Sequence, residues 1–538
     1  MGLWPFFSAL LHSDAIPYQI FGIGCVVGLI ALALFPGVYR FLEKGLVKIS
    51  IYVSASIVCL LFVFWSASYL FVPNYFDHGE PTVAIISALL LRGQPIYPAW
   101  DTGQGVYGTI YGPVLFFVHA AVLFLSKNIQ ATKFAGIVAI WLALVFIVLD
   151  ARRTIHLGSM VLVSMGSMVL VLFFFFNETF WNRPEPFLIL LSALGVRALR
   201  LPSTTAAPVI GLLAGLAAGL KLYAFLYFVP VAVALLSREA PSRTSALRLA
   251  GMMFAVALTT TLAPFLHPSV SLKDYLANLE LAADFGLLPF RLLENLKFPA
   301  VMITPCVAIY LIRRPVRSRE TELSLLALLI CAAITAVIAA TPGAGLWHLL
   351  PFLPPLMFLT LKFAMLERQH PGLSISNQTA ANWFFCLYIC AFGPSLLLSS
   401  TFMSRVITSS SLAWSQLAEL EKLYAIYPQA EMGVSDAANY PLTFYRVIGV
   451  LRGTPVHFEI PFIMDIHSVG LGDAATEALV EGCKITEWIL PTAGAPFSIS
   501  VGHYPGRDEV LSDKFRQDFE NNYRVVFNGN YYNVWSCR

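Results

Sequence analysis

The sequence predicts an all-α polytopic membrane domain followed by a small α/β domain outside the membrane. Of its 538 residues, 58% are hydrophobic and only 12% are charged, and the mean hydropathy is +0.73. Soluble domains carry roughly one quarter charged residues, so an ordinary soluble enzyme is excluded. Apolar runs of about 16 to 24 residues alternate with short polar segments, and runs of this length can cross a bilayer as helices.

The apolar runs occupy residues 1–400 and correspond to about twelve membrane spans. The first run, near 18–38, is followed by basic residues rather than a small-residue cleavage site, so we expect no cleaved signal peptide. Short loops rich in Lys and Arg favour the cytoplasm, and four such loops are therefore placed inside. The complementary loops face outward and comprise residues 73–108, 177–186, 267–296 and 341–347.

One part of the chain does not fit a simple alternation of spans. Three apolar runs, near 110–126, 134–150 and 157–176, lie between two loops assigned to the same side. An odd number of crossings cannot join two loops on one side. Either one run is re-entrant or interfacial, or one orientation is wrong. The first run has 17 residues and contains Gly112 and Pro113, which makes it the weakest candidate for a full span.

The composition changes near residue 401. Residues 1–400 contain 24 Lys and Arg against 16 Asp and Glu, whereas residues 401–538 contain 10 against 15. The acidic segment, 401–538, has no run long enough to span a membrane, so we expect a separate soluble domain on the outward side. It alternates strand-like and helix-like stretches, which predicts a small α/β domain. The strand-like stretches are 431–437, 457–465, 484–490, 523–526 and 531–535, and the helix-like ones are 443–451 and 474–480.

The composition also excludes several partners and cofactors. The net charge is +3 without a dense basic tract, so nucleic acid is not an expected partner. The eight Cys lack metal-ligand spacing, so neither zinc nor an iron–sulfur cluster is implied. A divalent metal would have to use Asp77, His78, Glu80 or Glu185, and His-x-Glu spacing alone is too weak a signal to predict one. We therefore predict no cofactor.

The first outward loop carries the strongest candidates for chemistry. Asp77 and Glu80 follow a spanning run closely, and Pro81 suits the first turn of an interfacial helix. A carboxylate at the membrane edge can take a proton from a substrate hydroxyl as a general base. Alternatively, both acids merely cap the positive end of that helix.

The second outward loop contains Arg183-Pro184-Glu185 directly before a spanning run. An Arg at the membrane edge can bind a phosphate through its planar donors, and Glu185 can orient it or contact a sugar hydroxyl. A plain Arg–Glu pair at a helix start is the structural alternative.

Two further basic groups lie near outward helix ends. Lys221 follows a Gly- and Ala-rich run, where a lone ammonium is costly unless it reaches water or an anion. It is either a phosphate ligand or a lysine that snorkels to the interface. His348 follows Trp347 at the start of a Pro-broken run. It can bond a phosphate or a hydroxyl, or simply the backbone.

Together and in this order, these segments resemble the GT-C superfamily of polytopic glycosyltransferases. That pattern has an early acid, Gly-x-Pro-x-Tyr, Tyr-x-Pro, Arg-Pro-acid, Gly-Leu-Ala-x-Gly-Leu-Lys, and His or an aromatic residue before Leu-Leu-Pro. The matching positions are Asp77, 93–97, 111–113, 183–185, 215–221 and 348–351. The resemblance covers roughly residues 50–366. Here the early acid is separated from Glu80 by His78 and Gly79, and the Arg-Pro-acid motif ends in Glu rather than the commoner Asp, so the subfamily and the sugar stay open.

The resemblance implies a reaction and a set of roles. The enzyme would transfer a sugar from a polyprenyl-phosphate-sugar donor to a hydroxyl of a glycan, lipid or protein acceptor, with inversion, outside the plasma (inner) membrane. The C-terminal domain would be periplasmic. Asp77 would be the catalytic base, with Glu80 as its substitute. The implied substrate-binding residues are His78, Tyr97, Tyr111, Arg183, Glu185, Lys221 and His348.

Two other functions compete with this one. A polytopic transporter or flippase of a lipid-linked sugar would also have broken helices, but it should show duplicated halves and polar groups in mid-span. We find no duplicated halves in the sequence. A ligase that moves a larger glycan from a polyprenyl diphosphate is poorly separated from the transferase by sequence alone.

Cys483 and Cys537 are the only Cys of the acidic segment. They adjoin two predicted strands, so neighbouring strands can bring them within bridging distance in an oxidising compartment. Two unrelated thiols are the alternative.

Overall fold

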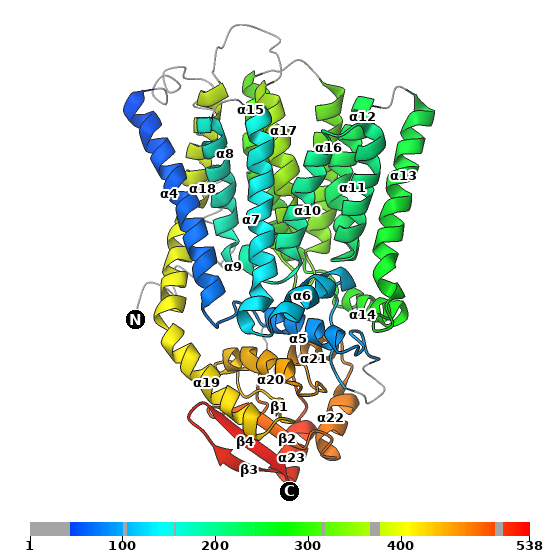
Figure 1. Cartoon of the computed structure of the whole chain (residues 1–538), viewed down its shortest axis with the longest axis vertical. Helices are drawn as coiled ribbons and strands as arrows, with labels where there is room; N and C mark the ends of the chain where they lie inside the picture. Colours follow the sequence, from blue (N-terminus) through cyan, green and yellow to red (C-terminus); the bar gives the residue numbers. More distant parts are fainter. Residues whose placement is uncertain are drawn as a thin grey trace.

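A bundle of helices stands on a smaller mixed domain, and the fold class predicted from the sequence is confirmed. The computed structural model describes residues 44–99, 105–154, 158–239, 242–313, 318–365, 377–500 and 509–538. The expected first run at 18–38 lies outside these residues. In Figure 1 the bundle helices run along the long axis, and the C-terminal domain lies below them.

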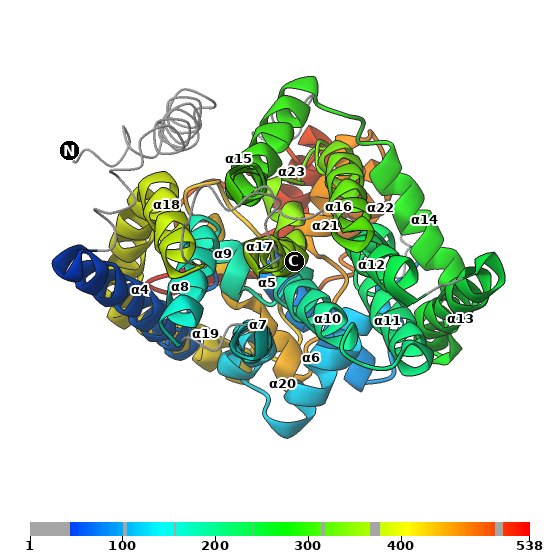
Figure 2. The ribbon, with the colours of Figure 1, turned by 90° about the horizontal axis from the view of Figure 1, so that it is seen from above.

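The bundle helices are arranged in two groups around α7, α10 and α17. Seen from above, α4, α8 and α18 lie together on one side and α11, α12 and α13 on the other (Figure 2). The bounds are α4 (Gly45–Phe71), α7 (Ile129–Thr154), α8 (Gly158–Phe174), α10 (Pro184–Ala198), α11 (Ser203–Ala218), α12 (Val229–Glu239), α13 (Arg243–Leu262), α15 (Pro289–Arg313), α16 (Arg319–Ile338), α17 (Leu353–Met365) and α18 (Asn377–Thr408).

The chain is a multi-pass membrane protein. Among the described residues, five helices are long and apolar enough to cross a membrane, and a pair within α18 that is bent by 57° makes a sixth candidate. The break follows Cys390, four positions before Pro394. Pro removes the hydrogen bond to the carbonyl four positions earlier and clashes with it, which bends a helix at that point. The total of about twelve spans stays a prediction.

Small residues let α11 and α13 approach closely. A Cβ atom at Gly211 would lie 2.4 Å from the carbonyl oxygen of Met253, and one at Gly215 would lie 2.5 Å from that of Ala257. Both distances are far below van der Waals contact, so only glycine fits.

Several short elements lie at the lower end of the bundle, next to the C-terminal domain (Figure 1). They are α5 (Gly79–Leu91), α6 (Pro113–Leu125), α9 (Phe176–Phe180), η2 (Leu222–Phe228), η3 (Ala263–Leu266), α14 (Leu272–Ala283) and η4 (Leu346–Phe352). With 13 residues, α6 is about 20 Å long, shorter than the roughly 30 Å hydrocarbon core. It is the run that the sequence marks as the weakest candidate for a full span.

The C-terminal domain is built on a four-stranded sheet in the order β1-β2-β4-β3, in which only β1 and β2 pair in parallel. Its core contains the fully buried rings of Trp488, Phe497, Phe515 and Phe519. Its elements are α19 (Ser410–Ile426), β1 (Glu431–Met432), η5 (Tyr440–Arg446), α20 (Val447–Arg452), α21 (Ile460–Ser468), α22 (Asp473–Glu481), β2 (Glu487–Pro491), α23 (Asp513–Asn522), β3 (Tyr523–Asn528) and β4 (Tyr532–Cys537).

One predicted strand of this domain is wrong. Residues 457–465 mostly form helix α21 rather than a strand. Ile460, Ile463 and Ile466 are all buried, and this spacing of three places them on one helix face. A short apolar run cannot be assigned to helix or strand by periodicity alone. Here the helix places the three isoleucines in the same buried core as Trp488 of β2.

Cys483 and Cys537 form a disulfide, which confirms the predicted pair. Their Cα atoms are 6.1 Å apart and their sequence separation is 54. The bond ties the turn before β2 to the end of β4, and so fastens the C-terminus to the sheet.

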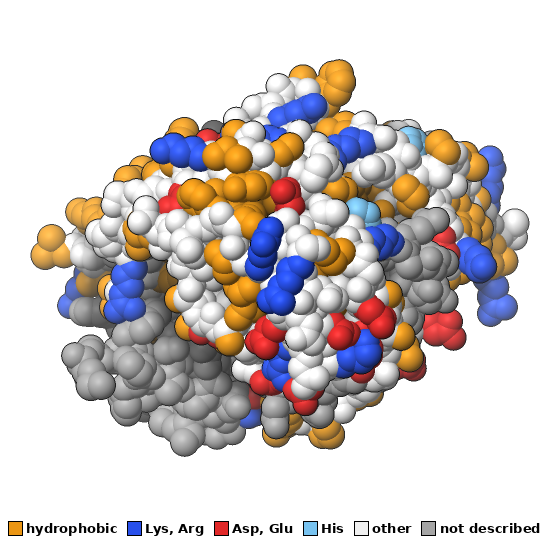
Figure 3. Space-filling view, turned by 90° about the horizontal axis from the view of Figure 1, so that it is seen from below, with side chains coloured by type: hydrophobic (Ala, Val, Ile, Leu, Met, Phe, Trp, Pro, Cys, Tyr) orange, Lys and Arg blue, Asp and Glu red, His pale blue; other side chains and the backbone are white. Residues whose placement is uncertain are grey.

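The two domains differ in the surface that they expose. The bundle exposes large apolar side chains such as Leu46, Phe64 and Phe254. Seen from below, the C-terminal domain shows interspersed basic and acidic side chains (Figure 3); Lys514, for example, pairs with Asp518 at 2.7 Å. The first surface suits lipid and the second suits water.

Candidate active site

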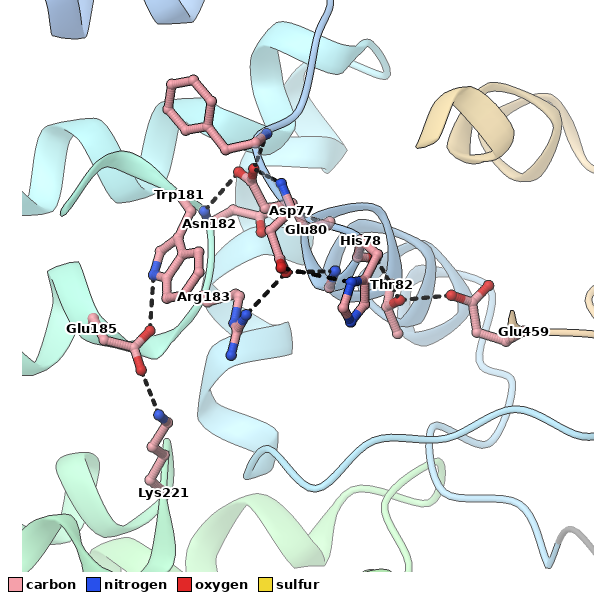
Figure 4. Close-up of polar contacts among 12 residues, drawn as sticks. Asp77, His78, Glu80, Thr82, Trp181, Asn182, Arg183, Glu185, Lys221 and Glu459 are labelled. Atoms are coloured by element: carbon pink, nitrogen blue, oxygen red, sulfur yellow. Dashed lines mark hydrogen bonds and ion pairs between the residues drawn. The ribbon is translucent and has the colours of Figure 1, made fainter. Parts of the chain in front are cut away.

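Polar side chains from three connecting segments meet where the bundle joins the C-terminal domain. Asp77 lies in the loop between α4 and α5, Arg183 is the N-cap of α10, and Lys221 lies between α11 and η2. Figure 4 shows these side chains with their hydrogen bonds and ion pairs. The loops are far apart in the sequence, so the site exists only in the folded bundle.

The Asp77 carboxylate is held from two sides. Its Oδ1 accepts hydrogen bonds from the Gly79 amide at 2.7 Å and from Nη1 of Arg183 at 2.9 Å. A Cβ atom at Gly79 would lie only 2.9 Å from the same oxygen, so this position needs glycine. The side chain of Asp77 keeps 24% of its surface exposed, against 11% for Arg183. Asp77 is therefore fixed in place yet reachable.

The surroundings keep Asp77 ionised. Burial alone would raise its pKa, but His78, Arg183 and the Gly79 amide outweigh that effect and lower the pKa to about 2. Burial lowers the pKa of His78 despite the attraction of Asp77, so the imidazole is neutral near pH 7. Nδ1 of His78 lies 3.7 Å from Oδ2 of Asp77. The ring centroids of His78 and Tyr440 are 6.0 Å apart.

Glu80 is completely buried and faces inward. Its carboxylate accepts hydrogen bonds from the Tyr69 hydroxyl at 2.5 Å and from the amides of Phe76 and Asn182 at 2.7 and 3.3 Å. Burial raises its pKa. Glu80 thus joins the start of α5 to α4 and to the second outward loop, which is close to the capping role that the sequence left open.

Arg183 is clamped between aromatic rings. Its guanidinium carbon lies 3.9 Å from the ring centroid of Trp181 and 5.5 Å from that of Tyr111. Such stacking favours Arg because the planar cation can also bond a carboxylate or phosphate at its edge. Nε of Arg183 is buried and has no hydrogen-bond partner among the described residues.

Glu185 and Lys221 form a second ion pair beside the first. The other oxygen of Glu185 accepts a hydrogen bond from the Trp181 indole at 2.8 Å. Glu185 is fully buried and the Lys221 side chain is 7% exposed. The ammonium of Lys221 also lies 5.7 Å from the centroid of the Tyr111 ring. This neutral pair explains how Lys221 is tolerated after an apolar run.

The fourth outward loop reaches the same cluster through aromatic contacts. Trp347 packs edge-on against Trp181 with centroids 6.0 Å apart, and the ring of His348 lies 5.8 Å from that of Tyr223. His348 is 8% exposed, and its Nδ1 has no hydrogen-bond partner among the described residues.

Tyr97 lies behind the site rather than in it. It is 1% exposed, and its hydroxyl donates a hydrogen bond of 2.6 Å to the carbonyl of Tyr111. It fixes the segment that carries Tyr111. Of the residues singled out from the sequence, the structure brings Asp77, His78, Arg183, Glu185, Lys221, Tyr111 and His348 into one cluster, with Glu80 and Tyr97 supporting it from behind.

Sequence reasoning missed several supporting residues. Lys133 is completely buried in α7, and its ammonium donates to the carbonyls of Val72 and Asn74 at 2.8 and 2.5 Å. A lysine directly before an apolar run was the available signal. The side-chain amide of Asn182 donates to the Glu80 carbonyl at 2.9 Å. It stands next to Arg183 in a loop that was already of interest.

A cavity of about 490 Å³ adjoins the cluster. It lies between α8, α9, α15, α18 and the loop before η4. Its walls combine aromatic rings with charged groups, among them Phe174, Glu178, Arg291, Lys297, Phe298 and Trp347. Burial raises the pKa of Glu178 to about 7. Trp347 lines the cavity and packs against Trp181, so this wall of the cavity borders the Arg183 cluster.

The described residues contain no group of three or more His, Cys, Asp or Glu side chains arranged to hold a metal ion. The carboxylates of the cluster are instead matched by Arg183 and Lys221.

We found no protein-family model that matches the sequence and no curated protein that does. The structure, however, resembles that of ArnT from Cupriavidus metallidurans. The apo form matches with a TM-score of 0.50 and the form bound to undecaprenyl phosphate with 0.51, both at 13% identity. The second match covers 92% of this chain and 98% of ArnT.

The chain has the GT-C fold. An oligosaccharyltransferase from Archaeoglobus fulgidus matches with a TM-score of 0.44 and 12% identity, over 84% of this chain and 70% of that one. At 13% identity the likeness to ArnT concerns the fold. The GT-C fold extends through the C-terminal domain, because the match to ArnT covers nearly the whole chain.

Proposed function

We propose that this GT-C protein is a membrane glycosyltransferase that moves a sugar from a polyprenyl-phosphate carrier to a hydroxyl group of an acceptor, with inversion. The observation that carries the proposal is the Asp77–Arg183 pair: an ionised, reachable carboxylate fixed beside a cation at the membrane edge. The fold supports it, because ArnT has been crystallised with undecaprenyl phosphate. The transferred sugar is a hexose or pentose, and the acceptor is a glycan, lipid or protein.

The reaction needs one base and one site for a leaving anion. Asp77 takes the proton of the acceptor hydroxyl, whose oxygen forms a bond to the anomeric carbon. The bond between that carbon and the phosphate oxygen breaks, and the carrier leaves as a phosphate monoester. Attack from the face opposite the leaving group inverts the anomeric configuration. Arg183 stabilises the charge that develops on the phosphate.

The shared position of Arg183 links donor binding to base strength. In the free protein, Arg183 helps to lower the pKa of Asp77 to about 2, which makes a weak base. When the donor phosphate forms hydrogen bonds with the Arg183 guanidinium, the Asp77–Arg183 ion pair weakens. The pKa of Asp77 then rises toward its ordinary value. The unfilled Nε donor of Arg183 and the unfilled Nδ1 of His348 are further phosphate contacts.

The cavity next to the cluster is the proposed place of the carrier. Its aromatic walls suit an isoprenoid chain, and Arg291 and Lys297 supply positive charge. Lys221 contributes less directly, because Glu185 already holds it. It keeps Glu185 and Trp181 in position under Arg183.

We place the site and the C-terminal domain on the periplasmic side of the plasma (inner) membrane. The basic loops support this side by the rule that Lys and Arg stay in the cytoplasm. The Cys483–Cys537 disulfide supports it as well, since such bonds persist in oxidising compartments.

Transfer by the purified full chain in nanodiscs, with defined polyprenyl-phosphate sugars and a panel of acceptors, tests the function. We expect a covalent product of inverted anomeric configuration, determined by NMR, and no product from Asp77→Asn. If the lipid-linked sugar crosses the proteoliposome membrane and no covalent product forms, the protein is a flippase and the proposed transferase function is wrong. A product from polyprenyl diphosphate donors alone would replace it by a ligase.

A further inference from the structure

A buried ion pair of the C-terminal domain reaches into the membrane domain beside Asp77. Arg446, at the end of η5, bonds Glu459 with both edges of its guanidinium: Nε to Oε2 at 3.0 Å and Nη2 to Oε1 at 2.5 Å. The two side chains are 5% and 1% exposed. Such a fork holds both groups in one geometry.

The same pair is bonded to the first turn of α5. Nη2 of Arg446 also donates to the hydroxyl of Thr82 at 3.1 Å and to the carbonyl of His78 at 3.3 Å. The Thr82 hydroxyl in turn donates to Oε1 of Glu459 at 2.6 Å. Figure 4 shows Thr82 and Glu459 next to His78. The two domains are thus joined at the residue that follows Asp77.

Backbone bonds reinforce the junction. The amide of Val106 donates to the carbonyl of His457 at 2.7 Å, and the amide of Glu459 donates to the carbonyl of Val106 at 3.0 Å. Glu459 is therefore tied to the first outward loop by its main chain as well as by its side chain. The C-terminal domain cannot move relative to this loop without breaking buried bonds.

The geometry has a direct bearing on the carboxylate. The peptide that begins at the His78 carbonyl ends at the Gly79 amide, and this amide bonds Oδ1 of Asp77 at 2.7 Å. If the His78 carbonyl shifts, the Gly79 amide shifts with it, and so does the carboxylate that Arg183 must meet. A displacement of about 1 Å in such an arrangement can cost on the order of 100-fold in rate.

We propose that Arg446, Glu459 and Thr82 are positioning residues, through which the C-terminal domain holds the Asp77 carboxylate in register with Arg183. The proposal rests on the proposed function for its kinetic consequences, but not for its structural ones. The C-terminal domain is then a required part of the active site.

Thr82→Val is the cleanest test, because it removes the bridging hydroxyl and keeps the size and the ion pair. Glu459→Gln removes the charge that the guanidinium faces. Glu421→Gln is the matched control, since Glu421 forms an ion pair with Arg452 in the same domain that is almost half exposed. Hydrogen exchange of peptides covering residues 74–84, measured by mass spectrometry on the full chain, needs no substrate. We expect faster exchange in this segment in both test variants and the wild-type exchange rate in the control.

The kinetic readout separates positioning from general damage. For Thr82→Val we expect kcat to fall about tenfold, KM for the donor to stay within about twofold, and the melting temperature to stay unchanged. Loosening the Asp77–Arg183 pair also shifts the midpoint of the acid limb of the pH profile to higher pH by about one pH unit. Wild-type exchange in residues 74–84 in both test variants would overturn the proposal, whether or not the protein shows transferase activity. So would changed exchange with unchanged kcat and pH profile in an active enzyme.

Discussion

Nη1 of Arg183 donates a hydrogen bond of 2.9 Å to Oδ1 of Asp77, across 106 positions of the chain. The cation comes from the N-cap of α10 and the carboxylate from the loop before α5. Each is fixed by its own neighbours, Trp181 for Arg183 and the Gly79 amide for Asp77. The pair is therefore assembled by the packing of two loops and is sensitive to changes in either.

Asp77→Asn should abolish transfer. The amide keeps the size of the side chain and can still accept the Gly79 bond, but it cannot take a proton, and a general base contributes about 10²–10⁴-fold. Initial rates with the lipid donor measure the loss, and the melting temperature checks the fold. Asp513→Asn is the control, because that side chain is 85% exposed on the C-terminal domain. Full activity of Asp77→Asn would move the base to Glu80.

The acid limb of activity should lie far below pH 5 and should rise when Arg183 is replaced. The pKa of Asp77 is lowered to about 2 in the folded protein, so the stability that this carboxylate contributes is present above its unfolded pKa of about 3.9 and is lost as the pH falls toward 2. In Arg183→Gln the Asp77 carboxylate loses its cation and its pKa rises. The midpoint of the acid limb should therefore shift to higher pH by at least about one pH unit. A pH profile of kcat/KM, restricted to the range in which the melting temperature is constant, measures the shift. An unmoved limb would show that another group controls it.

The Lys221–Glu185 pair should be needed as a pair. Lys221→Met leaves a fully buried carboxylate without its cation and should destabilise the protein by about 3–5 kcal/mol. Adding Glu185→Gln should restore most of this loss, because the neutral amide still accepts the bond from Trp181. Thermal unfolding of the two single variants and the double variant in one detergent tests the coupling. Additive losses would contradict it.

Lys297→Gln should weaken use of the lipid donor and leave use of the acceptor unchanged. Lys297 lines the cavity proposed for the carrier. We expect KM for the donor to rise about tenfold, as for the loss of one charge-assisted bond. Lys422→Gln, on the exposed side of α19, is the matched control. If donor and acceptor kinetics are both unchanged, the carrier binds elsewhere.

The disulfide should be present in protein taken directly from the membrane. Extraction under alkylating conditions and mass spectrometry of non-reduced peptides should show Cys483 linked to Cys537. Cys483→Ser should lower the stability of the C-terminal domain by about 2–4 kcal/mol, since the bond closes a long loop. Finding both thiols alkylated without reduction would reject the bond in the cell and remove one support for the periplasmic side.

Much of the architecture could be read from local features of the sequence. Apolar runs predicted the helical membrane domain because a bilayer demands about 20 apolar residues per span. The charge balance after residue 401 predicted a separate domain, and Cys483 and Cys537 predicted its disulfide. The strand expected at 457–465 was wrong, because Ile460, Ile463 and Ile466 suit either a buried strand or a helix and only their neighbours distinguish the two.

The sequence by itself drew attention to Asp77, Arg183 and Lys221, because charges next to apolar runs are costly and must have partners or a function. It did not determine those partners. Asp77 and Glu80 are three positions apart and chemically alike, yet one keeps part of its surface exposed beside Arg183 and the other is buried under Tyr69. The role of Arg446 was equally invisible in the sequence, since its contacts with Thr82 and His78 span more than 360 positions. Only tertiary packing decides which carboxylate faces solvent and which is buried, because that choice depends on how whole helices and domains come together.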